Sequence, residues 1–124
     1  MKIYKTQEEI EEDIKDGVLK IKGDVKFECS FKIEAKIIVE AGDIEAWDIE
    51  AGDIEARDIK AWDIKARNIE ARNIKARNIE AWNISFYAVC FACFSFKCKS
   101  IIGKRENNKY FCLDSEVIIN PKKG

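Results

Sequence analysis

Between Ala41 and Ser85 the apolar positions of the chain recur every five residues, in nine consecutive units of the form Ala-x-Asp/Asn-Ile-x. The position before each Ile is Asp as far as Asp63 and Asn from Asn68 onward. The second position is Gly, Trp or Arg, and the fifth is mostly Glu or Lys. Apolar pairs therefore alternate with polar residues along this whole stretch.

A period of five excludes both a helix and a single straight strand. An α-helix advances about 500° in five residues, so the Ile side chains would scatter around it and form no apolar stripe. In one straight strand, successive Ile side chains would alternate between faces, because the side-chain period is two. The period fits a chain that turns a corner every five residues. Each Ile and the Ala two residues later then point inward, and Asp or Asn bonds a backbone N–H two residues on.

These units resemble those of the pentapeptide-repeat family, whose usual frame is Ala-Asp/Asn-Leu followed by two variable residues. The resemblance is close from Ala41 to Ser85 and looser from about Cys29 to Ile101. It implies an all-β fold, a right-handed quadrilateral β-helix with four pentads in each coil. The chain departs from the family because one residue is inserted between Ala and Asp/Asn. The inward pair is therefore the large Ile followed by the small Ala, which reverses the family's usual order.

The charge pattern favours coils of twenty residues. Stacked strands lie about 4.8 Å apart, so like charges one coil apart should be rare. Among the fifth-position residues, a spacing of twenty gives one like-charge pair, Glu50 with Glu70, whereas a spacing of fifteen gives three. At a spacing of twenty, Asp48 would also stack on Asn68.

The inward positions of the repeat form the predicted core. Beyond the last regular unit, Phe replaces Ala in register, which predicts a bulky aromatic plug. The predicted core residues are Ile44, Ile49, Ile54, Ile59, Ile64, Ile69, Ile74, Ile79, Ile84, Phe86, Phe91 and Phe96.

The flanking segments predict ends for a single domain over residues 1–124. Residues 1–28 are predicted to form an N-terminal cap, with a short capping helix over 6–16 that starts at a Thr6–Glu9 capping box and stops at Gly17. Alternating apolar residues from Leu19 to Ile37 predict strands. The β-helix is assigned to residues 29–101. Residues 102–124 form a closing segment with candidate strands at 110–113 and 117–119 and a frayed tail at 121–124.

Composition narrows the classes of function. The 22 Lys and Arg residues balance 23 Asp and Glu residues, which argues against direct nucleic-acid binding. His is absent, which removes the usual neutral-pH general base. The carboxylates are repeat elements rather than a converging pair, and no Gly-rich phosphate loop occurs. We therefore expect no enzymatic activity, no catalytic residues and no cofactor.

The five cysteines allow two interpretations. Cys90 and Cys93 have the spacing of a zinc half-site, but Cys98 and Cys112 form no second pair. Packing of Cys as a small apolar side chain among the Phe residues is the favoured interpretation, so no metal is expected. The odd number of cysteines and the absence of an apolar leader predict a reduced, cytoplasmic compartment. The longest uncharged run is too short to span a membrane.

The outward second position contains the candidate partner surface. Coils of twenty residues would place Trp62 above Trp82, with Gly42 leaving a gap at the end of that column. A ladder of stacked rings that only stabilises the fold and a docking surface for a protein or a second copy both fit this arrangement. The candidate surface residues are Trp47, Trp62, Trp82, Arg67 and Tyr87.

The sequence thus predicts a non-enzymatic structural or protein-interaction module. Residues 40–56 hold seven acidic residues and no basic ones. This band is the basis of an alternative hypothesis, because some pentapeptide-repeat proteins resemble DNA and inhibit type II topoisomerases.

Overall fold

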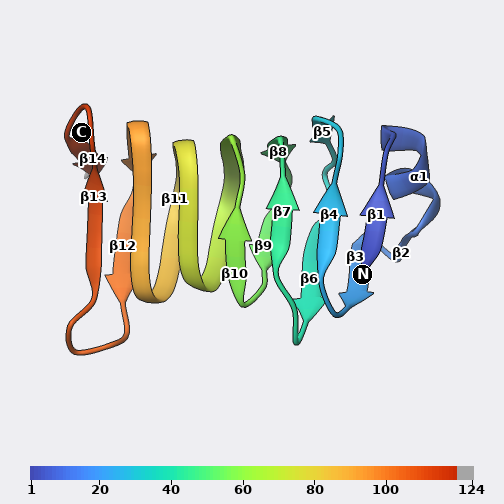
Figure 1. Ribbon diagram of the computed structural model, residues 1–124, viewed down its shortest axis with the longest axis horizontal. Helices are drawn as coiled ribbons and strands as arrows, with labels where there is room; N and C mark the ends of the chain where they lie inside the picture. Colours follow the sequence, from blue (N-terminus) through green and yellow to red (C-terminus); the bar gives the residue numbers. More distant parts are fainter. Residues whose placement is uncertain (120–124) are drawn as a thin grey trace.

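Residues 1–119 are described by a computed structural model, in which they wind into a β-solenoid of about six turns (Figure 1). The predicted all-β solenoid is therefore confirmed. The tail predicted at 121–124 lies outside the described residues.

The N-terminal elements are short and include the helix. They are β1 (Lys2–Tyr4), α1 (Gln7–Glu12), β2 (Ile14–Lys15), β3 (Val18–Lys22), β4 (Val25–Phe27), β5 (Phe31–Lys32) and β6 (Lys36–Glu40).

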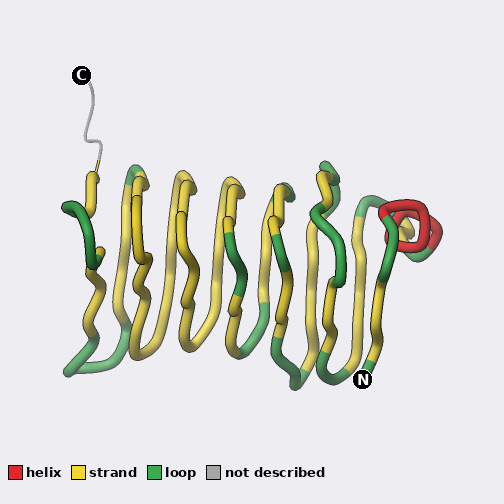
Figure 2. The backbone as a smooth tube through the Cα atoms, turned by 45° about the horizontal axis from the view of Figure 1, so that its top comes forward, coloured by secondary structure: helices red, strands yellow, loops and turns green. Residues whose placement is uncertain are grey.

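The repeats and the closing segment follow. Their strands are β7 (Ile44–Ala46), β8 (Asp48–Glu50), β9 (Asp53–Glu55), β10 (Asp58–Lys60), β11 (Asp63–Cys98), β12 (Ser100–Gly103), β13 (Lys109–Cys112) and β14 (Val117–Ile119). The long β11 continues around successive corners, as Figure 2 shows.

Each regular coil contains fifteen residues, or three pentads, so the predicted twenty-residue, quadrilateral coil is wrong. Ile59 of β10 pairs in parallel with Ile44 of β7 and with Ile74 of β11. The second face pairs Ile49 with Ile64. The third pairs Ile54 with Ile69. The regular coils are therefore three-sided.

The like-charge pairs that seemed to exclude this register are present at the surface. Glu55 pairs with Glu70, but Lys36 approaches Glu55 at 3.9 Å and Lys104 approaches Glu70 at 3.8 Å. Long exposed side chains turn toward partners in other coils, and surface charge pairs contribute only about 0–1 kcal/mol. Charge repulsion is therefore too weak to set the length of the coil.

The Ile columns form the predicted core. Every repeat Ile from Ile44 to Ile84 is at most 2% exposed, and burial of each stabilises the fold by roughly 1.5–3 kcal/mol. Phe86 and Phe96 are also buried, as predicted.

The prediction for Phe91 is wrong. Its side chain points outward and stacks on Phe111 with ring centroids 5.1 Å apart. The inward positions there are Cys90 and Ala92, because one extra residue follows Phe86. The N–H of Val89 thus donates to the side chain of Asn73, sixteen residues earlier rather than fifteen.

The Asp and Asn side chains form ladders between coils, whereas the sequence predicted bonds to a backbone N–H two residues on. Asn68 Nδ2 donates to Asp53 Oδ1 at 3.0 Å, and Asn83 Nδ2 donates to Asn68 Oδ1 at 2.9 Å. The other two faces repeat this arrangement, with Asn73 donating to Asp58 and Asn78 to Asp63. An amide both donates and accepts, so Asn extends a ladder in which stacked carboxylates would repel each other.

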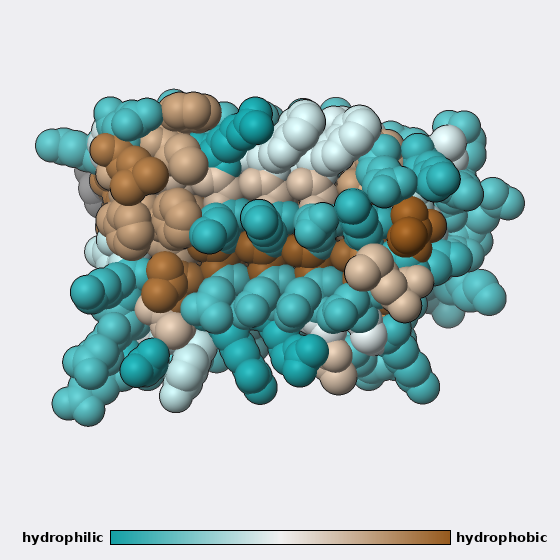
Figure 3. Space-filling model, in the orientation of Figure 1, coloured by the Kyte–Doolittle hydropathy of each residue, from teal (hydrophilic) through white to brown (hydrophobic). Residues whose placement is uncertain are grey.

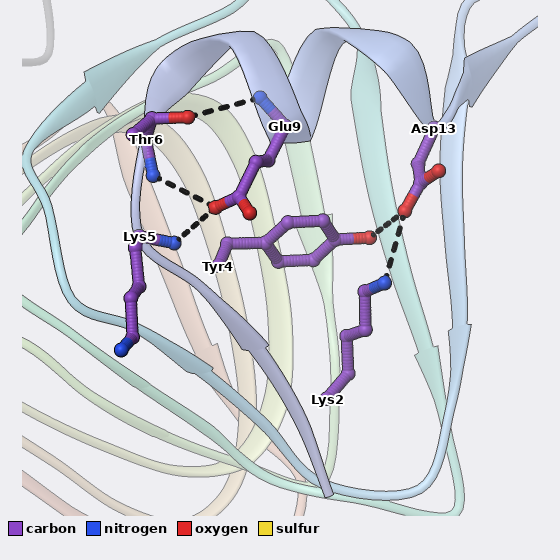
Figure 4. A network of polar contacts seen from close by, with 6 residues as sticks. All are labelled: Lys2, Tyr4, Lys5, Thr6, Glu9 and Asp13. Atoms are coloured by element: carbon purple, nitrogen blue, oxygen red, sulfur yellow. Dashed lines mark hydrogen bonds and ion pairs between the residues drawn. The ribbon is translucent and has the colours of Figure 1, made fainter.

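Helix α1 lies at the N-terminal end of the solenoid (Figure 2) and is shorter than predicted. The Thr6–Glu9 capping box is confirmed: the N–H of Glu9 donates to Thr6 Oγ1, and the N–H of Thr6 donates to Glu9 Oε1 (Figure 4). The chain then turns into the β2–β3 hairpin through Asp16 and Gly17, both with positive φ. Such a pair is a hairpin signal, and it explains the early end of the helix.

Tyr4 and Asp13 join β1 to the end of the helix. Tyr4 Oη donates to Asp13 Oδ2 at 2.7 Å, and Lys2 Nζ lies 3.5 Å from the same oxygen (Figure 4). The bond from Tyr4 lowers the pKa of Asp13, and Lys2 lowers it further. Burial and the Asp13 carboxylate together raise the pKa of Tyr4.

The ladder register predicts that Asn68→Asp destabilises the fold by about 1 kcal/mol, since it removes the donor to Asp53 and stacks two carboxylates. Denaturant unfolding measures the change, and added salt should reduce its repulsive part. Adding Asp53→Asn should restore most of the loss, because an amide again adjoins a carboxylate. Adding Asp48→Asn, the partner at a spacing of twenty, should not. Rescue by Asp48→Asn alone would contradict the fifteen-residue register.

Candidate functional site

The second positions of the repeat lie at the three corners of the solenoid, where backbone hydrogen bonds join them along its axis. Trp62 N donates to Trp47 O at 2.8 Å, and Arg77 N donates to Trp62 O at 2.7 Å. The fifteen-residue register places Gly42, Arg57, Arg72 and Tyr87 at the first corner, Trp47, Trp62 and Arg77 at the second, and Gly52, Arg67, Trp82 and Lys99 at the third. The five predicted surface residues are therefore divided among three corners and do not form one patch.

The second corner, which we call the tryptophan corner (Trp47, Trp62 and Arg77), contains a stacked pair of rings with a cation over it. The rings of Trp47 and Trp62 stack with centroids 5.4 Å apart and 7° between their planes. Arg77 lies over the Trp62 ring, 4.8 Å from its centroid. Both indoles remain 42% exposed. The predicted stacking of Trp62 on Trp82 is wrong because the coil has three sides.

Trp82 is on the third corner, where Lys99 Nζ lies 4.4 Å from its ring centroid. Arg67 precedes it in the same column, and Tyr87 is on the first corner. Trp82 and Tyr87 are both about half exposed. These residues are not brought together with the tryptophan corner.

The glycines at the start of the repeat leave no gap for a ligand. A Cβ on Gly42 would lie 2.2 Å from the backbone carbon of Gly23, and one on Gly52 would lie 2.7 Å from Glu34 O. The preceding irregular coil passes directly against these corners. The predicted gap beside Gly42 is therefore absent, and Gly occupies both positions because only its backbone fits.

The acidic band at residues 40–56 encircles the solenoid. Its Glu residues project from different faces and meet Lys residues of the preceding coil. The nitrogen–oxygen separations are 3.6 Å for Lys26–Glu45, 3.4 Å for Lys32–Glu50 and 3.9 Å for Lys36–Glu55. The band is thus a belt with a cation from the preceding coil on each face.

Charge is separated along the axis of the solenoid. Residues 1–56 carry 8 basic and 16 acidic residues, whereas residues 57–119 carry 12 basic and 7 acidic residues. A linear solenoid converts this sequence asymmetry into a spatial one. The result is an electrostatic gradient from an acidic N-terminal half to a basic C-terminal half.

An open groove of about 690 Å³ follows the first corner. One wall is formed by Glu40, Glu55 and Glu70, and the other includes Arg57 and Arg72. The walls have opposite charge, and Lys104 already contacts Glu70 at 3.8 Å. This groove is a charged surface channel rather than a water-excluded cavity suited to catalysis.

Cys90 and Cys98 are buried, whereas Cys93 and Cys112 are half-buried. Burial raises the pKa of Cys90, and it raises the pKa of Cys98 to about 11. Among residues 1–119, no group of three or more His, Cys, Asp or Glu side chains is arranged to bind a metal ion. Cys90 lies inward in the core, whereas Cys93 is only partly covered, so the two thiols of the predicted half-site have different surroundings.

None of the helices in the described part of the chain has the length and hydrophobicity needed to cross a bilayer. Comparisons with protein families, with curated proteins and with solved structures find no match for this chain.

The sequence did not identify the tryptophan corner as a unit. The signal was present, because Trp47, Trp62 and Arg77 are spaced by fifteen residues. The coil of twenty residues predicted from the charges would separate these three residues.

Cysteine burial predicts selective alkylation of the folded protein. At about pH 8, iodoacetamide should modify Cys93 and Cys112 well before Cys90 and Cys98, because buried thiols are protonated and shielded. Peptide mass mapping over time measures each site, and unfolding in guanidinium should make all five cysteines reactive. Equal rates at Cys90 and Cys93 in the folded protein would contradict the assigned core.

Proposed function

We propose that the protein is a non-enzymatic interaction module that uses the tryptophan corner to bind a protein partner. The stacked, exposed pair of Trp47 and Trp62, with Arg77 over it, is the observation that supports this proposal. Trp and Arg are enriched at the energetic centres of protein interfaces. Their placement on hydrogen-bonded corners orders them before binding, which reduces the entropy lost on association.

We also infer that the chain is a variant relative of the pentapeptide-repeat family. The five-residue unit and the β-solenoid support this inference. The three-sided coil sets the chain apart from the family's usual four pentads.

DNA mimicry is not favoured by the arrangement of the acidic residues. A mimic of duplex DNA needs negative charge along its length, as in the regular spacing of phosphates. Here Glu45, Glu50 and Glu55 project from three different faces within one coil, about 4.8 Å thick, and each meets a Lys. The following coils are basic.

The proposed function predicts that Trp47→Ala/Trp62→Ala abolishes capture of a specific partner from the host lysate. Trp82→Ala, on the third corner, is the matched control and should retain capture. Binding should be repeated with the purified partner, where loss of both indoles should weaken the Kd at least about tenfold.

Thermal melts on the same variants distinguish binding from stability. Loss of the ring stack should cost about 0.5–1.5 kcal/mol, which leaves the variant folded at the temperature of the binding assay. Equal capture by wild type and Trp47→Ala/Trp62→Ala, with only a lower melting temperature, would show that the stack is structural and overturn the proposal.

A further inference from the structure

A groove of about 370 Å³ runs beside the tryptophan corner, on the face of the solenoid that contains β7 and β10. One of its walls is formed by Trp62 and Arg77 of that corner. Its floor consists of small side chains that the fold leaves almost fully buried: Ala46, Ala61 and Ala76. Figure 3 shows strips of apolar atoms between rows of polar side chains on this face.

The opposite wall contains two adjacent cations. Lys60 pairs in register with Lys75, so their backbones lie about 4.8 Å apart, and both side chains are exposed. The other register neighbour of Lys60 is Glu45, which forms an ion pair with Lys26 instead, at 3.6 Å. Among residues 1–119, no carboxylate forms an ion pair with either Lys60 or Lys75.

The third face treats its like-charge neighbours differently. Glu55 and Glu70 also pair in register, but each has a lysine partner, Lys36 at 3.9 Å and Lys104 at 3.8 Å. The fold therefore neutralises that pair of carboxylates and leaves the pair of ammonium groups in the groove without a counter-charge. An acidic ligand would supply it.

Arg77 adds a third cation to the groove. Its guanidinium lies over the Trp62 ring, and no carboxylate of the described residues forms an ion pair with it. A guanidinium stacked on a ring keeps its in-plane N–H groups for hydrogen bonds with oxygen acceptors. Both walls of the groove thus present donors to a bound chain.

The aromatic rings in the groove have no open faces. The Trp62 ring has the other indole of the tryptophan corner on one side and Arg77 on the other. Phe91 has Lys75 Nζ at 5.4 Å from its centroid and the Phe111 ring at 5.1 Å. Nucleobases bind by stacking on open ring faces, so this arrangement suits a peptide, whose side chains can pack on ring edges, better than a single-stranded nucleic acid.

We propose that the groove binds an extended acidic segment of the partner protein. This inference rests on the proposed function and names the chemistry of the partner. Side chains of an extended chain project alternately to opposite sides, so carboxylates at every second position face Lys60 and Lys75. The residues between them face Trp62 and Arg77. The four coils that line the groove span about 14 Å, which is the length of about four extended residues.

Fluorescence anisotropy with a labelled acidic peptide tests the inference on the full chain. The probe is fluorescein-labelled Gly-Glu-Leu-Glu-Leu-Glu-Gly, and the wild type should bind it with a Kd below about 100 µM. The same peptide with Gln in place of each Glu should bind at least about tenfold more weakly. Lys60→Gln/Lys75→Gln should also weaken binding of the acidic peptide at least about tenfold, because its carboxylates lose both partners.

The matched control is Lys65→Gln/Lys97→Gln. Both residues are exposed and lie together on the second face, so this variant removes the same charge without touching the groove. It should change the Kd less than about twofold, and far-UV dichroism checks that both variants are folded. Equal weakening by the two variants would show that only long-range charge acts and would overturn the site.

Two further results would overturn the inference. One is the absence of saturable binding up to about 1 mM peptide. The other is binding of a ten-nucleotide thymidine oligomer as tightly as the acidic peptide, which would assign the groove to single-stranded nucleic acid.

Partner capture separates this inference from the proposed function. Loss of capture by Trp47→Ala/Trp62→Ala but not by Lys60→Gln/Lys75→Gln would overturn the acidic segment alone. Capture retained by Trp47→Ala/Trp62→Ala would overturn the proposed function, whatever the peptide does.

Discussion

Parallel backbone pairing between residues fifteen apart is the constraint on which the regular part of this structure depends. It aligns the Ile columns in the core, the Asp/Asn ladders on the faces and the indoles at the tryptophan corner. The Ile columns, the Asp/Asn ladders and the stacked indoles share this register. Apolar burial, amide hydrogen bonds and ring stacking therefore support one another. Agreement between such terms is what makes a repetitive chain adopt one fold.

Much of the fold could be predicted from the sequence. The five-residue period excluded a helix and identified the buried Ile columns, and the capping box identified the start of α1. The number of pentads in a coil could not be predicted, because identical units stack equally well at any multiple of five. Surface charges suggested coils of twenty residues, but exposed residues such as Glu55 and Glu70 pair with other side chains. The repulsion between them is small compared with the free energy gained by burying each Ile. Phe91 was misplaced because one extra residue changes which side chains point inward.

The grouping of the candidate site residues also depends on the number of pentads in a coil. The sequence marked the exposed Trp and Arg residues, but their grouping follows directly from the coil length. At fifteen residues, Trp47, Trp62 and Arg77 share a corner, whereas Trp82 and Tyr87 lie on the other two. The C-terminal end arises differently: Tyr110 and Ile119 continue the inward columns of Cys90 and Cys98 but are exposed, and no further described coil stacks on them. The tryptophan corner and the C-terminal end are therefore separate surfaces.

Backbone nuclear Overhauser contacts test the central claim most directly, because they report which residues adjoin across neighbouring coils. In a uniformly labelled sample, the account predicts Hα-to-amide contacts between residues fifteen apart, such as Ile59 with Ile74 and Ile49 with Ile64, since paired strands lie about 4.8 Å apart. Contacts between residues twenty apart, such as Ile59 with Ile79, without those at fifteen would contradict the three-sided coil and every column that follows from it.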